Sequence, residues 1–79
     1  MMTSLVDVED ARTRLASGEE AYGFQVGELF TMLGPACRFG AEYLQNLRTE
    51  GRYAESLEEA TQMADAKGVS ITGIWFVKR

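Results

Sequence analysis

Apolar residues recur at helical spacing near the start of the chain. They stand at Leu5, Val8, Ala11 and Leu15. Ser4 precedes them in the position of an N-cap, with Asp7 three residues later, and Gly18 follows them as a C-terminal stop. The pattern predicts a helix over about residues 5–17.

The next stretch follows two periods in turn. Tyr22, Phe24 and Val26 alternate with other positions as in a strand. From Val26 to Leu33 the apolar residues then step as in a helix, although two glycines oppose one helix through the whole stretch. We therefore expect a short extended piece near residues 21–26, followed by a helical turn or two.

Two further helices are predicted in the second half of the chain. Pro35 suits the first turn of a helix, and an apolar stripe follows it down to Gly51. The stripe consists of Ala36, Phe39, Tyr43, Leu44 and Leu47. Ser56 and Glu59 have the spacing of a capping box, which opens a helix ending at Gly68.

The last residues, 69–79, have two interpretations, of which the first is a strand. One face would carry Val69, Ile71, Trp75 and Val77, and the other Ser70, Thr72, Ile74 and Phe76. β-branched and aromatic residues dominate this segment, which favours the strand. Its pairing partner would be either residues 21–26 or the same strand of a second molecule.

The second interpretation rests on a spacing that resembles the helix-turn-helix of phage repressors. The residues that fall on that pattern are Ala64, Gly68, Ile74 and Val77. The resemblance implies a small DNA-binding transcriptional regulator that uses residues 56–79. Its groove-facing positions would include Trp75 and Phe76, whereas base edges are read chiefly by arginine, lysine, asparagine and glutamine.

Together the patterns predict one α+β domain over residues 1–79. It would be helix-rich, with three to four helices and a C-terminal strand, which pairs in one arrangement with the short strand near residues 21–26. A chain this short buries only about 60% of its unfolded surface, so its stability is marginal. Both a monomer and a homodimer remain open.

The net charge and the start of the chain indicate which partners and which cell compartment to expect. The formal net charge is −4, which opposes attraction to nucleic-acid phosphates and to anionic lipid surfaces. The start of the chain lacks the basic and apolar regions of a secretory signal. We expect a cytoplasmic protein that binds neither nucleic acid nor membrane directly.

The usual catalytic side chains are missing from the sequence. There is no histidine, which removes His-based triads and the usual zinc ligand sets. The single cysteine, Cys37, lies beside an apolar stripe and is expected to be a buried structural thiol. The sequence predicts a protein that is not an enzyme and that uses no cofactor or metal.

The acidic residues are the candidate partner-binding residues. They are Asp7, Glu9, Asp10, Glu19, Glu20 and Glu28, with Tyr22 as a neighbouring aromatic. Carboxylates on a small rigid surface can imitate a nucleic-acid backbone, or they can simply keep the protein soluble. Any of the aromatics Tyr22, Phe24, Tyr53, Trp75 and Phe76 that stayed at the surface would serve as a binding anchor.

In its length, acidity and lack of catalytic motifs, the whole chain resembles the small inhibitors that bacteriophages encode, including anti-CRISPR proteins. The resemblance implies a non-enzymatic inhibitor that binds a host nucleoprotein complex with a basic surface, such as a CRISPR effector. It would act by occluding the DNA-binding channel of that complex in the host cytoplasm. The resemblance assigns no site residues.

Overall fold

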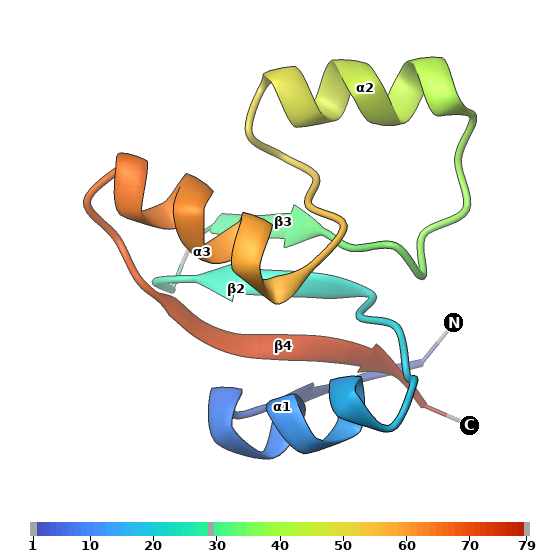
Figure 1. Cartoon of the computed structure of the whole chain (residues 1–79), viewed down its shortest axis with the longest axis vertical. Coiled ribbons are helices and arrows are strands. Elements are labelled where there is room, and N and C mark those ends of the chain that lie inside the picture. The colour runs from blue at the N-terminus through green and yellow to red at the C-terminus, as the bar shows by residue number, and fades with distance from the viewer. Residues whose placement is uncertain (1, 29, 79) are drawn as a thin grey trace.

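A four-stranded antiparallel sheet forms the centre of the protein in the computed structural model, which describes residues 2–28 and 30–78 (Figure 1). The strands are β1 (Thr3–Val6), β2 (Gly23–Val26), β3 (Phe30–Leu33) and β4 (Ile71–Val77). Their order across the sheet is β1-β4-β2-β3. β4 is therefore central and pairs with β1 along one edge and with β2 along the other.

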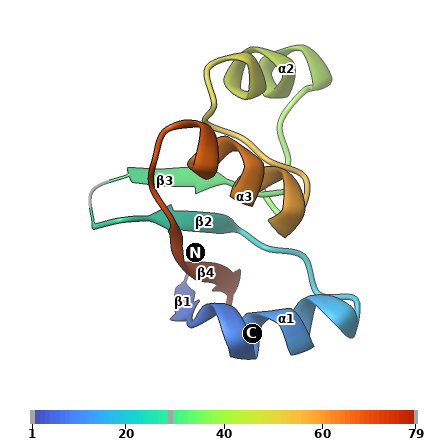
Figure 2. The ribbon, with the colours of Figure 1, turned by 60° about the vertical axis from the view of Figure 1, so that its left-hand side comes forward.

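Helices connect these strands and cover one face of the sheet. α1 (Val8–Ala16) links β1 to β2, whereas α2 (Ala41–Thr49) and α3 (Leu57–Ala66) both lie between β3 and β4 in the sequence. α1 and α3 lie on the same face, and α2 stands beyond β3 (Figure 1). A turned view shows that no helix of the described residues covers the opposite face (Figure 2). None of the described helices is long and apolar enough to span a membrane.

Side-chain caps fix the start of α1 and α3. The Asp7 carboxylate accepts a hydrogen bond from the Asp10 backbone N–H at 2.8 Å, and the Ser56 hydroxyl accepts one from the Glu59 N–H at 3.2 Å. Each cap satisfies a backbone donor that the helix itself leaves unpaired. The predicted N-cap at Ser56 is confirmed, and the Glu59 carboxylate reaches back to the Glu55 N–H, one residue before the cap, at 3.4 Å.

The core lies between the covered face of the sheet and the two helices. Its fully buried large side chains are Phe24, Met32, Ile74 and Phe76. The helices contribute small residues, Ala11 from α1 and Ala60 and Ala64 from α3. Small side chains let each helix approach the sheet closely, while the larger strand residues fill the space between the layers.

Two predictions for the first 33 residues are wrong. Residues 3–6 belong to β1, so the first helix begins at Val8 and is capped by Asp7 rather than Ser4. The expected helical turns after Val26 are replaced by β3, which pairs with β2. In both places pairing with a neighbouring strand satisfies a whole row of backbone groups, and this outweighs the helical spacing of the side chains.

The helix predicted from Pro35 is shorter than expected. It begins at Ala41, because the chain first makes a turn in which the Cys37 N–H donates to the Gly34 carbonyl at 3.1 Å. The same turn is attached to the segment before β2, where the Ala21 carbonyl accepts from the Ala36 N–H at 2.9 Å.

The strand interpretation of the C-terminal segment is confirmed. Residues 71–77 form β4, which pairs with β2, one of the two partners considered, so the recognition helix of the helix-turn-helix interpretation does not form. Because both edges of β4 are occupied, β4 cannot pair with its counterpart in a second molecule. Ile74 and Phe76 are buried in the core, whereas Trp75 is half-buried on the opposite face.

The uncovered face of the sheet carries Trp75 and Leu5, which lie opposite each other in the pairing of β4 with β1. Trp75 donates its indole N–H to the Gln25 side-chain oxygen at 3.1 Å, which satisfies both polar groups at the surface. Leu5 is 47% exposed and covers Gly73, where an added Cβ would lie 2.7 Å from the Leu5 Cδ1 atom. Gly73 therefore leaves the space that the leucine occupies.

Candidate partner-binding cleft

A cleft of about 1140 Å³ opens on the helix-covered side of the molecule. α1 contributes Leu15, α3 contributes Leu57, and the buried rings of Phe24 and Tyr53 lie beneath them. The segment between β3 and α2 completes this side of the lining with Phe39. Ligand pockets are usually between about 300 and 1,000 Å³, so this cleft is large enough for a peptide segment.

An exposed aromatic pair stands at the α2 side of the cleft. Phe39 is 48% exposed and Tyr43 is 53% exposed, and their ring centroids lie 5.1 Å apart in an edge-to-face arrangement. Phe39 lines the cleft itself, and Leu44 extends the lining into α2. We call Phe39 and Tyr43 the aromatic rim. Exposed aromatic rings that support one another are typical anchors of protein interfaces.

The aromatic rim was not predicted as a site. The sequence pattern placed Phe39 and Tyr43 in an apolar stripe, and the structure leaves both side chains about half exposed. Leu47 is the α2 residue that the structure buries. No signal in the sequence separates this stripe from a buried one, because its spacing is that of an ordinary amphipathic helix.

An ion pair attaches the C-terminal half of α2 to α3. The Arg48 guanidinium donates to both carboxylate oxygens of Glu59, with the Nη2–Oε2 distance at 2.7 Å, and its Nη2 lies 3.5 Å from Glu55 Oε2. The hydrogen bonds from Arg48 lower the pKa of Glu59 below its ordinary value. α2 is thus attached near Leu47 and Arg48, whereas the aromatic rim consists of Tyr43 in its first turn and Phe39 just before it.

The titratable groups beneath the cleft are held neutral. Burial raises the pKa of the Cys37 thiol, whose Sγ lies 3.2 Å from the Tyr22 carbonyl oxygen as a hydrogen-bond donor. Burial also raises the pKa of Tyr53, and the nearby Glu55 carboxylate adds to that rise. Neutral, buried groups of this kind suit packing and recognition better than nucleophilic attack. The expected burial of Cys37 is confirmed.

The predicted acidic residues fall into three separate places. Asp7, Glu9 and Asp10 lie at the start of α1, and Asp7 is its cap. Glu19 and Glu20 follow the other end of α1 and line the cleft.

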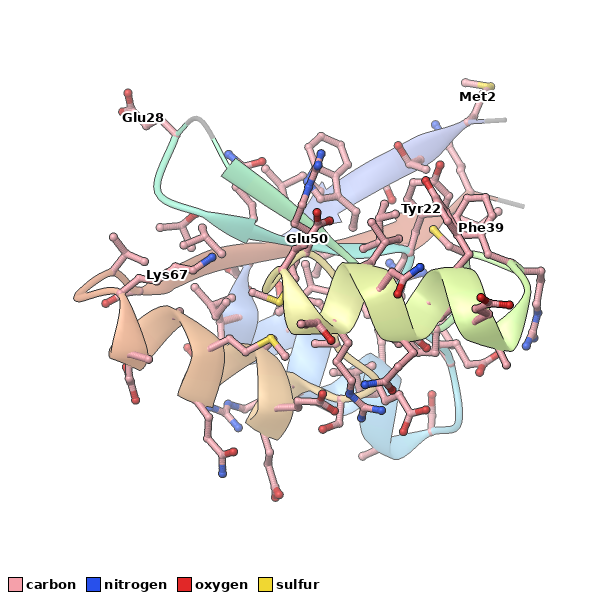
Figure 3. The ribbon with its side chains drawn as sticks, turned by 90° about the horizontal axis from the view of Figure 1, so that it is seen from above. Met2, Tyr22, Glu28, Phe39, Glu50 and Lys67 are labelled. Atoms are coloured by element: carbon pink, nitrogen blue, oxygen red, sulfur yellow. The ribbon has the colours of Figure 1, made fainter. Side chains whose placement is uncertain are left out.

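Glu28 lies at the far side of the molecule from Tyr22 and Phe39 (Figure 3). Tyr22 is half-buried, and its backbone carbonyl accepts from the Cys37 thiol. The fold thus brings Glu19 and Glu20 to the cleft, and it leaves Glu28 apart from them.

Arginines accompany the two glutamates at the cleft. Arg14 pairs with Glu19 at 2.7 Å, and the same guanidinium lies 4.2 Å from the centre of the Phe76 ring. Arg38 pairs with Glu20 at 2.7 Å. These pairs hold the carboxylates in place at the edge of the cleft, although exposed pairs add little stability. The pairing was not foreseen, because Arg38 and Glu20 are far apart in the sequence.

Among the described residues, no group of three or more cysteine, aspartate or glutamate side chains is arranged to hold a metal ion. Comparisons with protein-family models, with curated proteins and with solved structures found no match to this chain.

Proposed function

We propose that this protein acts without catalysis, by binding another protein through the cleft and its aromatic rim. The observation that carries the proposal is the edge-to-face pair of Phe39 and Tyr43, about half exposed beside a cleft with an apolar floor. Burying such rings in a partner stabilises a complex strongly, because a few desolvated aromatic anchors supply most of the binding energy in protein interfaces.

The carboxylates around the cleft favour a partner with a basic surface. Glu19, Glu20, Glu55 and Glu58 line it, and the chain as a whole carries a formal net charge of −4. Complementary charge raises the rate of encounter and selects partners by repelling surfaces of the same sign. Basic protein surfaces of this kind are typical of complexes that bind nucleic acids.

We propose more specifically that the protein is a phage-encoded inhibitor of a host defence complex, such as a CRISPR effector. It would occupy the basic channel of that complex and exclude DNA from it. The support for this form is the whole-chain profile of small size, acidity and missing catalytic motifs, together with a surface that offers anchors as well as carboxylates. An inhibitor of this kind needs tight binding and no chemistry.

A pull-down from host lysate tests the proposal. Tagged protein is incubated with lysate, with and without nuclease, beside a variant carrying Phe39→Ala and Tyr43→Ala. Leu5→Ala is the matched control, since Leu5 is as exposed as Phe39 but lies on the uncovered face of the sheet. We expect a nucleic-acid-handling complex that survives nuclease treatment, is lost with the double variant and is kept with the control. Equal retention by all three proteins contradicts the proposal.

A further inference from the structure

We propose that the cleft takes a basic amphipathic peptide segment of the partner, with a bulky apolar side chain over its floor and lysine or arginine on either side. This inference rests on the proposed function and specifies the chemistry of its partner. A segment of the partner would insert into the cleft, as opposed to a contact between two flat surfaces.

The lining of the cleft separates into an apolar floor and a charged edge. The accessible apolar surface comes from the half-buried Leu15 of α1 and Leu57 of α3, with Phe39 and Leu44 on the α2 side, whereas Phe24 is fully buried beneath them. A single apolar side chain of Leu, Phe or Met size contributes favourably to binding when it is removed from water. A segment with one such side chain would therefore gain affinity from the floor that a purely polar segment lacks.

The edge of the cleft is acidic. Four glutamates line it, namely Glu19, Glu20, Glu55 and Glu58. Arg38 pairs with Glu20, and Arg14 and Arg48, which lie beside the lining, pair with Glu19 and Glu55. Glu58 is exposed and makes no ion pair with any described residue, so it is available to a cation on the partner. The Glu58 carboxylate and the formal net charge of −4 on the chain oppose nucleic-acid phosphates and acidic peptides and favour lysine or arginine.

The attachment of α2 suits a segment that enters beside it. Arg48 and Leu47 attach the C-terminal half of the helix, whereas Tyr43 and Phe39 precede that attachment and are about half exposed. A peptide lying along the cleft would cover both rings on one side and meet Glu58 of α3 on the other. Helices in grooves are commonly recognised in this way, by one apolar face and flanking charges.

Three fluorescently labelled synthetic peptides provide the test. The first is an amphipathic helix of leucine and lysine, the second has glutamate in place of every lysine, and the third has serine in place of every leucine. Fluorescence anisotropy measures their binding to the full chain. We expect the leucine–lysine peptide to bind at least about tenfold more tightly than either of the others. Equal binding of the glutamate peptide, or of the serine peptide, overturns the inference, and so does failure of all three to bind.

Charge-reversal variants locate the binding. Glu58→Lys changes the cleft, and Glu9→Lys is the matched control, because each glutamate lies in the first turn of its helix and is exposed. The first variant should weaken binding of the leucine–lysine peptide about fivefold or more, and the second should leave it within about twofold, as expected for charges at and away from an interface. Equal effects of the two variants would show non-specific attraction and contradict a cleft site.

Failure of this inference differs from failure of the proposed function. If the pull-down recovers a partner that Phe39→Ala with Tyr43→Ala abolishes, but the peptides show no preference, the rim binds a folded surface and the segment inference is wrong. If the peptides bind as expected but no complex is recovered in a manner that depends on the rim, the cleft chemistry holds and the proposed function does not.

Discussion

Removal of the ion pair between Arg48 and Glu59 should loosen α2 from α3. Both hydrogen bonds of the pair are charge-assisted, and the two side chains are 34% and 22% exposed, so water screens them only in part. Exposed pairs contribute up to about 1 kcal/mol, and two-point arginine–carboxylate geometry favours the upper end. We therefore expect Glu59→Gln to lower the free energy of unfolding by about 1 kcal/mol at neutral pH. In a domain of this size that is a fall of about 4–8 °C in Tm.

The loss of unfolding free energy caused by Glu59→Gln should depend on pH. The pKa of Glu59 lies below its ordinary value of 4.5 in the folded protein, chiefly because of the hydrogen bonds from Arg48. The stabilisation is therefore complete above the unfolded pKa, and it disappears as the pH falls through the lower, folded pKa. Thermal unfolding followed by circular dichroism, at neutral and at acid pH, measures the stability of the wild type and of Glu59→Gln. The difference between wild type and Glu59→Gln should shrink on acidification.

A double-mutant cycle separates the pair from the other contacts of Glu59. Arg48→Met, Glu59→Gln and the double variant should give a coupling free energy of about 1 kcal/mol at neutral pH, since the two side chains touch. The Glu59 carboxylate also accepts from the Glu55 N–H, and the cycle removes that contribution. A coupling near zero, or a Glu59→Gln difference that persists unchanged at acid pH, would refute the reasoning.

Three further predictions concern the fold. Asp7→Ala should cost about 1 kcal/mol of stability as the loss of a helix cap, whereas Ser4→Ala should be nearly neutral in the same chemical denaturation assay; equal costs would contradict the cap assignment. Gly34→Ala should destabilise by about 1–3 kcal/mol, because its Cβ would lie 2.5 Å from the Ala21 carbonyl oxygen, and an unchanged midpoint would exclude that close approach. Cys37 should react slowly with a thiol reagent until the protein unfolds, as burial raises its pKa; fast reaction of the native protein would contradict its burial.

The sequence predicted those elements whose local signals agree with their surroundings. At α3 the capping box, the apolar spacing and the terminal glycine all lie within one helix, and the structure has that helix at Leu57–Ala66. A similar signal at Ser4 predicted a helix start that does not form, because residues 3–6 pair with an edge of β4 as strand β1. Local spacing carries no information about which distant strand needs a partner, so pairing of β1 with β4 could not be read from the first residues.

The candidate site depended still more on distant contacts. The apolar stripe with Phe39 and Tyr43 looks like a buried helix face, yet nothing in its spacing tells whether the rest of the fold covers it. The acidic residues were identified individually, but only the fold decides that Glu19 and Glu20 meet Glu58 at one cleft while Glu28 lies elsewhere. Composition thus predicted the net charge of the surface, whereas the tertiary structure decides which acidic residues lie together.

Hydrogen–deuterium exchange of the protein, alone and bound to the partner recovered from lysate, tests the central claim most directly. The account predicts slower exchange in the complex for residues 36–44 and 55–62, which surround the cleft and carry the aromatic rim. Exchange in β1 and along the uncovered face of the sheet should stay unchanged. Protection confined to β1 and that face, with the cleft residues exchanging as in the free protein, would contradict binding through the cleft.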